Sequence, residues 1–123
     1  MSTITVTNIQ ATGQASRSAT GVAAAWMNLN GTGTIAVQDS INVSSVTDVG
    51  AGSYTQTHTN AMGNALYSSQ ISNNRSTSTN NSTSQHIDGS YTSALLNILF
   101  VRHDNLASED SSRILTSVHG DLA

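Results

Sequence analysis

Histidines and carboxylates are the side chains of this sequence that could build a metal site. The chain has four histidines and seven Asp and Glu residues, but no cysteine. A metal site needs ligands that converge in space, and none of the spacings H-x-H, H-x-x-x-H and HExxH occurs. We therefore expect hydrogen-bonded or solvated side chains at all four, which are His58, His86, His103 and His119. The sequence predicts no metal-binding, cofactor-binding or catalytic residue.

Isolated acids offer a second chemistry, the cleavage of glycans. It would need two carboxylates about 5–10 Å apart, and the candidates are Asp39, Asp48 and Asp88. Single acids in loops are more often caps or turn residues. The tripeptide RHD at 102–104 joins three polar functions, but neighbours on a strand point to opposite faces, so a turn at a strand end is favoured. No nucleophile elbow is present.

Composition excludes several classes of partner. The formal charge is −3 over 123 residues, and the only cations are four scattered arginines. Nucleic-acid binding needs clustered cations that neutralise phosphates, so that class is not expected. No run approaches the roughly 20 apolar residues of a membrane span, and the opening MSTITVTNIQ lacks the features of a signal peptide.

Alternation of apolar and polar residues with a period of two is the strongest structural signal. Asn30-Gly31, with Gly33 beyond, predicts a turn because these residues tolerate positive φ. The predicted strands cover residues 4–9, 22–29, 35–39, 41–46, 54–59, 65–71, 85–87, 91–101 and 114–119. About seven to nine short strands between turns predict an all-β fold, a small antiparallel β-sandwich. A short helix over 107–115, capped by Ser108, is the alternative there.

The predicted core is thin. The chain has one Trp and one Phe, whereas burial at about 25 cal/mol per Å² must offset about 1.5 kcal/mol of ordering entropy per residue. A monomer would be marginally stable, so we predict association with copies of itself. Residues 10–20 have the composition of a linker, which divides the chain into an arm over 1–20 and a sandwich over 21–123.

One run of residues carries a resemblance to a known family. It comprises 25–34, AWMNLNGTGT, and 39–48, DSINVSSVTD, followed by Gly50, Gly52, Tyr54-Thr55 and Ala61-Met62. This run resembles a β-rich domain of tailed-bacteriophage virion proteins, especially at tail-fibre C-termini. The opening MSTITVTNIQ resembles the start of short phage fibre proteins, and VHGD at 118–121 resembles the final strand of the family.

The resemblance implies a homotrimeric fibre tip or similar appendage, with no enzyme activity and no cofactor. It implies structural or interface roles for five residues, which are Trp26, Asn30, Gly31, Gly33 and Tyr54. His58 and His119 stand where the family usually has aromatic core residues. We therefore expect two histidines close together in a repacked core. A histidine repeated on a three-fold axis is the alternative that would bind a metal.

The leading functional hypothesis is a bacteriophage virion structural protein, in a tail fibre or its receptor-binding tip, that contributes to host attachment. The first alternative is a capsid decoration or head-fibre protein, located on the virion and attached to other virion proteins through residues 1–20. The third, a polysaccharide-degrading module, is the least favoured. The expected partners are copies of the chain, other virion proteins and host surface polysaccharide or another receptor, without nucleic acid or membrane insertion.

A polar segment over residues 73–85 is the predicted receptor-facing loop, because it has no apolar residue to bury and loops carry recognition on rigid scaffolds. Tyr91 would add a stacking face for a sugar ring. The alternative is a solvated loop without a recognition role. The hydrogen-bonding side chains of the loop are those of Asn73, Asn74, Arg75, Asn80, Asn81 and Thr83.

Overall fold

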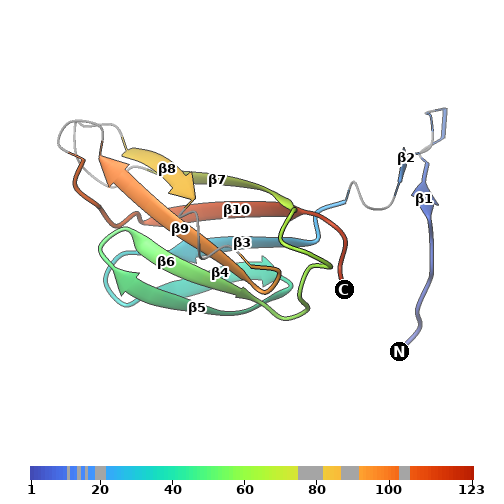
Figure 1. Ribbon diagram of the computed structural model, residues 1–123, viewed down its shortest axis with the longest axis horizontal. Coiled ribbons are helices and arrows are strands. Elements are labelled where there is room, and N and C mark those ends of the chain that lie inside the picture. Colours follow the sequence, from blue (N-terminus) through green and yellow to red (C-terminus); the bar gives the residue numbers. More distant parts are fainter. Residues whose placement is uncertain are drawn as a thin grey trace.

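Two four-stranded antiparallel sheets form a β-sandwich in the computed structural model (Figure 1). The structure describes the chain apart from residues 11, 14, 16, 19–21, 75–81, 87–91 and 103–105. The first sheet has the order β4-β3-β10-β7 and the second β5-β6-β9-β8. The predicted all-β antiparallel sandwich is confirmed.

The strands of the first sheet are β3 (Ala25–Asn30), β4 (Ala36–Ile41), β7 (Ser68–Asn74) and β10 (Arg113–His119). Those of the second are β5 (Val43–Gly50), β6 (Ser53–His58), β8 (Ser82–His86) and β9 (Leu95–Arg102). Two short strands, β1 (Asn8–Ile9) and β2 (Arg17–Ser18), pair antiparallel. Figure 1 shows this pair and the segment before it standing apart from the sandwich. We call residues 1–18 the arm.

The core comes from the inner strands of both sheets. Alternate residues of β3, β6, β9 and β10 are buried, because successive side chains on a strand point to opposite faces. Aromatic packing adds Tyr54 and Phe100, whose ring centroids lie 6.5 Å apart. The buried apolar residues are Ala25, Met27, Leu29, Tyr54, Met62, Tyr67, Leu96, Ile98, Phe100, Ile114 and Val118.

Asn42 carries the chain from the first sheet to the second. Its φ is +57°, in the left-handed region that asparagine tolerates better than most residues. Its side-chain amide donates to Ala24 O (3.1 Å) and Asn60 O (3.0 Å), and its side-chain oxygen accepts the Asn60 N–H at 2.7 Å. Three hydrogen bonds therefore fix the corner between β4 and β5.

Several sequence predictions need correction. The segment 107–115 is not helical, since β10 begins at Arg113 and an isolated bridge joins Ser108 to Val101. The strand predicted over 4–9 shrinks to β1. The polar loop predicted over 73–85 is strand at both ends, where β7 and β8 lie. The described residues include no helix that could span a membrane.

Candidate functional site

The turn after β3 is held by its own asparagine. The Asn30 side-chain oxygen accepts hydrogen bonds from the Thr32 N–H (3.1 Å) and the Thr32 hydroxyl (2.8 Å). This arrangement is an Asx turn, in which a short polar side chain replaces a backbone partner. Gly33 follows with φ +64° and lies exposed. The NGTG run therefore shapes the backbone of a turn.

Gly31 and Tyr54 meet inside the sandwich. The Tyr54 hydroxyl lies 2.7 Å from Gly31 O and 2.9 Å from Asp110 Oδ1, two acceptors for its single proton. The same Asp110 oxygen accepts the Gly52 N–H at 2.7 Å. A Cβ at Gly31 would lie 2.6 Å from the Tyr54 oxygen, so no larger residue fits without displacement. Motif residues far apart in sequence thus form one hydrogen-bonded node.

In this node the Tyr54 hydroxyl is a hydrogen-bond donor that keeps its proton. Burial and the Asp110 carboxylate together raise the pKa of Tyr54 far above its usual range, because both disfavour the phenolate. The hydroxyl stays protonated and donates to the neighbouring oxygens. We conclude that Tyr54 and Gly31 stabilise the fold.

Trp26 lies on the opposite, outer face of the first sheet. Its neighbours Ala25 and Met27 are buried, whereas Trp26 itself is partly exposed. The strand register places side chains in rows across this face. One row is Ile41, Trp26, Ser117 and Gln70, and the next is Asp39, Asn28, Leu115 and Ser72. We call these eight residues, together with Asn30, the Trp26 face.

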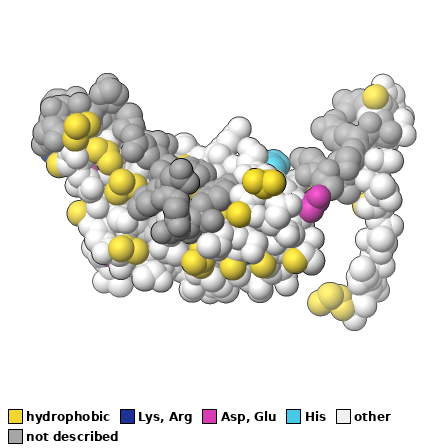
Figure 2. Space-filling model, viewed as in Figure 1, with side chains coloured by type: hydrophobic (Ala, Val, Ile, Leu, Met, Phe, Trp, Pro, Cys, Tyr) yellow, Lys and Arg dark blue, Asp and Glu magenta, His cyan; other side chains and the backbone are white. Residues whose placement is uncertain are grey.

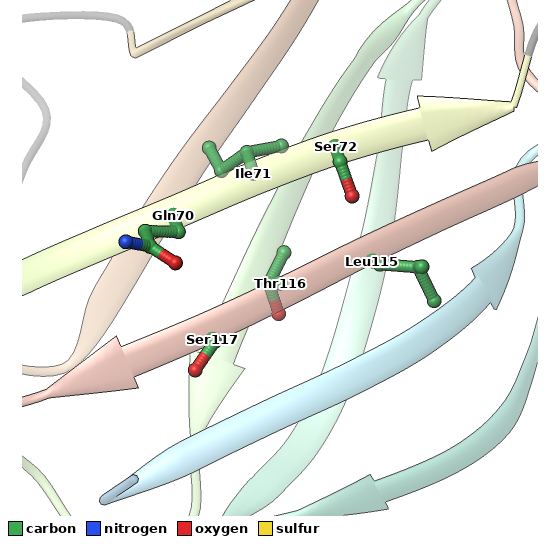
Figure 3. A pocket seen from close by; sticks show the side chains of 6 residues that line it. All are labelled: Gln70, Ile71, Ser72, Leu115, Thr116 and Ser117. Carbon is green, nitrogen blue, oxygen red and sulfur yellow. The ribbon is translucent and has the colours of Figure 1, made fainter.

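Two hollows mark the Trp26 face. The first has a volume of about 480 Å³ and lies along β7 and β10, where Figure 3 shows Gln70 and Ser72 on one strand and Leu115, Thr116 and Ser117 on the other. The second, of about 320 Å³, is lined by Asn28, Asn30, Gln38, Ser112 and Arg113. The first is partly apolar, while the second is walled by amides, a hydroxyl and a guanidinium.

Several polar side chains of this face have no hydrogen-bond partner among the described residues. In the described part of the chain, no hydrogen bond engages the side chains of Trp26, Asn28 or Gln70. Amides offer both donors and acceptors, and the indole offers one N–H beside a flat apolar surface. Asp39 and Arg113 supply one charge of each sign, both exposed. The arrangement can bind a neutral, hydroxyl-rich ligand that also has an apolar side.

Of the two histidines expected to lie together in the core, His58 is buried and His119 lies on the outer side of β10 with Ser117. His58 is buried and packs edge-on against Tyr67, with ring centroids 5.7 Å apart. Burial lowers its pKa, although Nδ1 lies 3.3 Å from Ser93 O, and its Nε2 has no partner. His119 instead follows buried Val118 and is only half-buried, with Nε2 3.0 Å from the Ser117 hydroxyl. The expectation of a histidine pair is therefore wrong.

The remaining predicted residues that the structure describes lie on different strands. Asp39 points outward from β4, while Asp48 lies on β5 of the other sheet, and Asp88 falls outside the described residues. Asn73 and Asn74 end β7. Thr83 belongs to β8, while Arg75, Asn80, Asn81 and Tyr91 fall outside the described residues. Among the described residues, no group of three or more His, Cys, Asp or Glu side chains could hold a metal ion.

Only part of the Trp26 face could be predicted from the sequence. Alternation along β3 places Trp26 and Asn28 on one side of the strand, but nothing local shows which side is buried. Gln70, Ser72, Leu115 and Ser117 reach the same face through pairings across more than 40 residues. No known protein family, no curated protein and no solved structure matches this chain.

Proposed function

We propose that this chain is a structural protein of a bacteriophage virion, in a tail fibre or its receptor-binding tip, and that it contributes to host attachment by holding surface polysaccharide on the Trp26 face. The observation that carries the proposal is the chemistry of that face. A partly exposed indole lies in a row with Ser117 and Gln70, next to the amide of Asn28.

Polysaccharide fits this chemistry better than a protein or nucleic-acid partner does. A sugar ring has an apolar face of C–H groups that packs on an indole, and a rim of hydroxyls that needs planar donors and acceptors. The amides of Asn28 and Gln70 supply both. The face is too polar for an obligate protein interface, whose core is apolar. Arg113, which lines the second hollow, is one cation, whereas binding to a phosphate backbone needs several.

The phage assignment rests on the resemblance of residues 25–34 and 39–48, together with the roles of those residues in the fold. Asn30, Gly31 and Asn42 belong to the resembling run and each forms a turn or corner. A motif whose members build the scaffold supports shared architecture more strongly than chance similarity. A homotrimer is part of the proposal, because it would bury surface that the thin core leaves exposed.

Binding to an array of bacterial surface polysaccharides tests the proposed ligand. We expect the wild-type chain to bind at least one polysaccharide. Asn28→Ala and Gln70→Ala should each weaken binding about tenfold, equivalent to about 1.4 kcal/mol, without a change in melting temperature. Thr47→Ala is the matched control, since it truncates an exposed side chain on the other sheet.

Two outcomes would contradict the proposal in different ways. Unchanged binding by both amide variants would remove the Trp26 face from recognition. Absence of the protein from purified phage particles, tested by mass spectrometry, would remove the virion role. Detection on tail-less heads alone would instead favour a capsid decoration or head-fibre protein.

A further inference from the structure

The core is open along the side of the sandwich where β4 and β5 lie. Val37 is the register partner of fully buried Leu29 and so lies on the inward face of its sheet, yet it is 41% exposed. On β5, Val43 and Val46 face buried residues of β6 and contact the core, but both are only partly buried. Inward-facing valines on both edge strands therefore lack a cover.

The two edge strands carry no lysine, arginine or proline against pairing, and β5 has one inward-facing charge, Asp48, the register partner of buried Tyr54. Natural edges carry lysine, proline or inward-pointing charge that prevents another strand from adding. The sequence has no proline, all four of its cations are arginines, and none of these lies in β4 or β5. The stretch from Ser45 to Asp48 forms a regular ladder with β6 between two irregularities. β5 is the last strand of its sheet, so among the described residues no strand lies along its other edge.

The arm has the sequence pattern of a strand over residues 2–7, although the structure forms only the short β1 at Asn8–Ile9. Residues 2–7, STITVT, alternate Ile4 and Val6 with threonines, a pattern typical of a half-buried strand. Ile4 is 86% exposed and Val6 is 51% exposed. Figure 2 shows the arm standing clear of the sandwich, and it shows a row of hydrophobic side chains along the lower margin, the side on which Figure 1 draws β5.

We propose that the arm of one copy adds as a strand to the free edge of β5 in a second copy. Ile4 and Val6 would point inward over Val37, Val43 and Val46 and close the core. The threonines of the arm would point outward, as do Ser45 and Thr47 of β5, which pair with outward-facing threonines of β6. The added strand would thus continue the pattern of the sheet, in which apolar side chains point into the core and hydroxyl groups point to solvent.

A second copy is the occupant that the geometry favours. The β1–β2 pair holds the arm beyond the end of its own sandwich (Figure 1), where it stands clear of its own β5. Each copy carries both the donor strand and the acceptor edge. Such head-to-tail contacts form a closed ring when the rotation between copies closes and an open filament when it does not, and the predicted homotrimer would be one such ring. This inference does not rest on the proposed function.

Cross-linking in mixed samples tests the exchange, because the chain has no cysteine. The Thr5→Cys variant is mixed separately with Ser45→Cys and with Thr47→Cys, one partner carrying a tag, and each mixture is mildly oxidised. Thr5→Cys mixed with Ser72→Cys, on the exposed outer side of β7, is the control. We expect a mixed disulfide with at least one β5 variant and none with the control.

Two results would overturn the inference. One is cross-linking that is absent from both β5 mixtures or equal in the control, which would leave another virion protein as the partner of the arm. The other is a double variant, Thr5→Cys with Thr47→Cys, that forms only an internal disulfide in dilute solution. That result would show the arm folding onto its own sandwich.

Charge placed on either side of the arm tests the predicted orientation. Ile4→Asp with Val6→Asp should convert the wild-type assembly to monomer, measured by light scattering on the full chain. Thr3→Asp with Thr5→Asp adds the same charge on the outward side and should leave most of the assembly intact. Equal loss in both variants, or a wild-type chain that is monomeric at high concentration, would contradict the proposal.

Discussion

Replacing Tyr54 by phenylalanine removes one oxygen from the centre of the sandwich and keeps the ring packed on Phe100. The lost hydroxyl is the donor for Gly31 O and for the Asp110 carboxylate. A hydrogen bond to a charged acceptor contributes about 1.5–3 kcal/mol, and a buried acceptor left without its donor adds to the cost. Asp110 keeps the Gly52 N–H. We therefore expect the free energy of unfolding to fall by about 2–3 kcal/mol.

Urea and thermal unfolding, followed by circular dichroism, measure this loss. For a chain of this size each kcal/mol corresponds to about 4 °C, so the melting temperature should fall by about 8–12 °C. Tyr67→Phe is the matched control, because the Tyr67 hydroxyl donates to neutral backbone oxygens, those of Thr92 (3.1 Å) and Leu95 (2.8 Å). It should cost about 1 kcal/mol.

A double-mutant cycle with Asp110→Ala isolates the charged interaction. Tyr54 and Asp110 are in direct contact, so their effects should be non-additive by about 1 kcal/mol or more. A Tyr54→Phe variant that loses less than about 0.5 kcal/mol, the range of ordinary surface substitutions, would refute the reasoning. The node would then not explain why the motif contains this tyrosine.

Three further predictions follow from buried or strained positions. Burial lowers the pKa of His58 in the folded state, so the unfolded state binds a proton at this residue more readily. The free energy of unfolding should therefore have its full value above about pH 6.5 and fall below that pH, by at most about 1.4 kcal/mol per pH unit. In urea titrations at several pH values, His58→Phe should lessen this dependence and His119→Gln should keep it. Gly31→Ala should cost about 1–3 kcal/mol by overpacking, measured by thermal unfolding, whereas Gly63→Ala, whose Cβ would lie 3.5 Å from the nearest atom, should be nearly neutral. Asn42→Gly keeps the backbone conformation but loses three side-chain hydrogen bonds, about 2–3 kcal/mol in chemical denaturation, and Asn42→Ala should lose about 1 kcal/mol more.

The sequence by itself determined the type of most elements. Alternation predicted a strand over 54–59, and its alternate residues Tyr54, Gln56 and His58 are all buried on β6. The turn at Asn30-Gly31 was also predicted from the sequence. Both signals are local, because the pleat of a strand has a period of two and the backbone of a turn depends on a few residues.

Tertiary structure decided which polar segments became strands. The serine- and asparagine-rich β7 has little apolar character, yet it pairs with β10 over seven residues, from Ser68 to Asn74. Its ladder is made by backbone groups, which do not depend on the polarity of the side chains. Hydrophobic alternation is therefore a poor guide at the edge of a sheet. It predicted a strand over 65–71 but missed the last residues of β7, and it missed the first residues of β8.

Tertiary structure also decided which side of β3 became the Trp26 face. One side carries Ala25, Met27 and Leu29, and the other carries Trp26 and Asn28, a contrast too weak to fix the direction of burial from the sequence. The direction is set by β10, which pairs with β3 from almost ninety residues away and places Ile114 and Val118 beside the smaller apolar side chains. Burial is a property of two packed sheets, so it is settled only when distant strands meet.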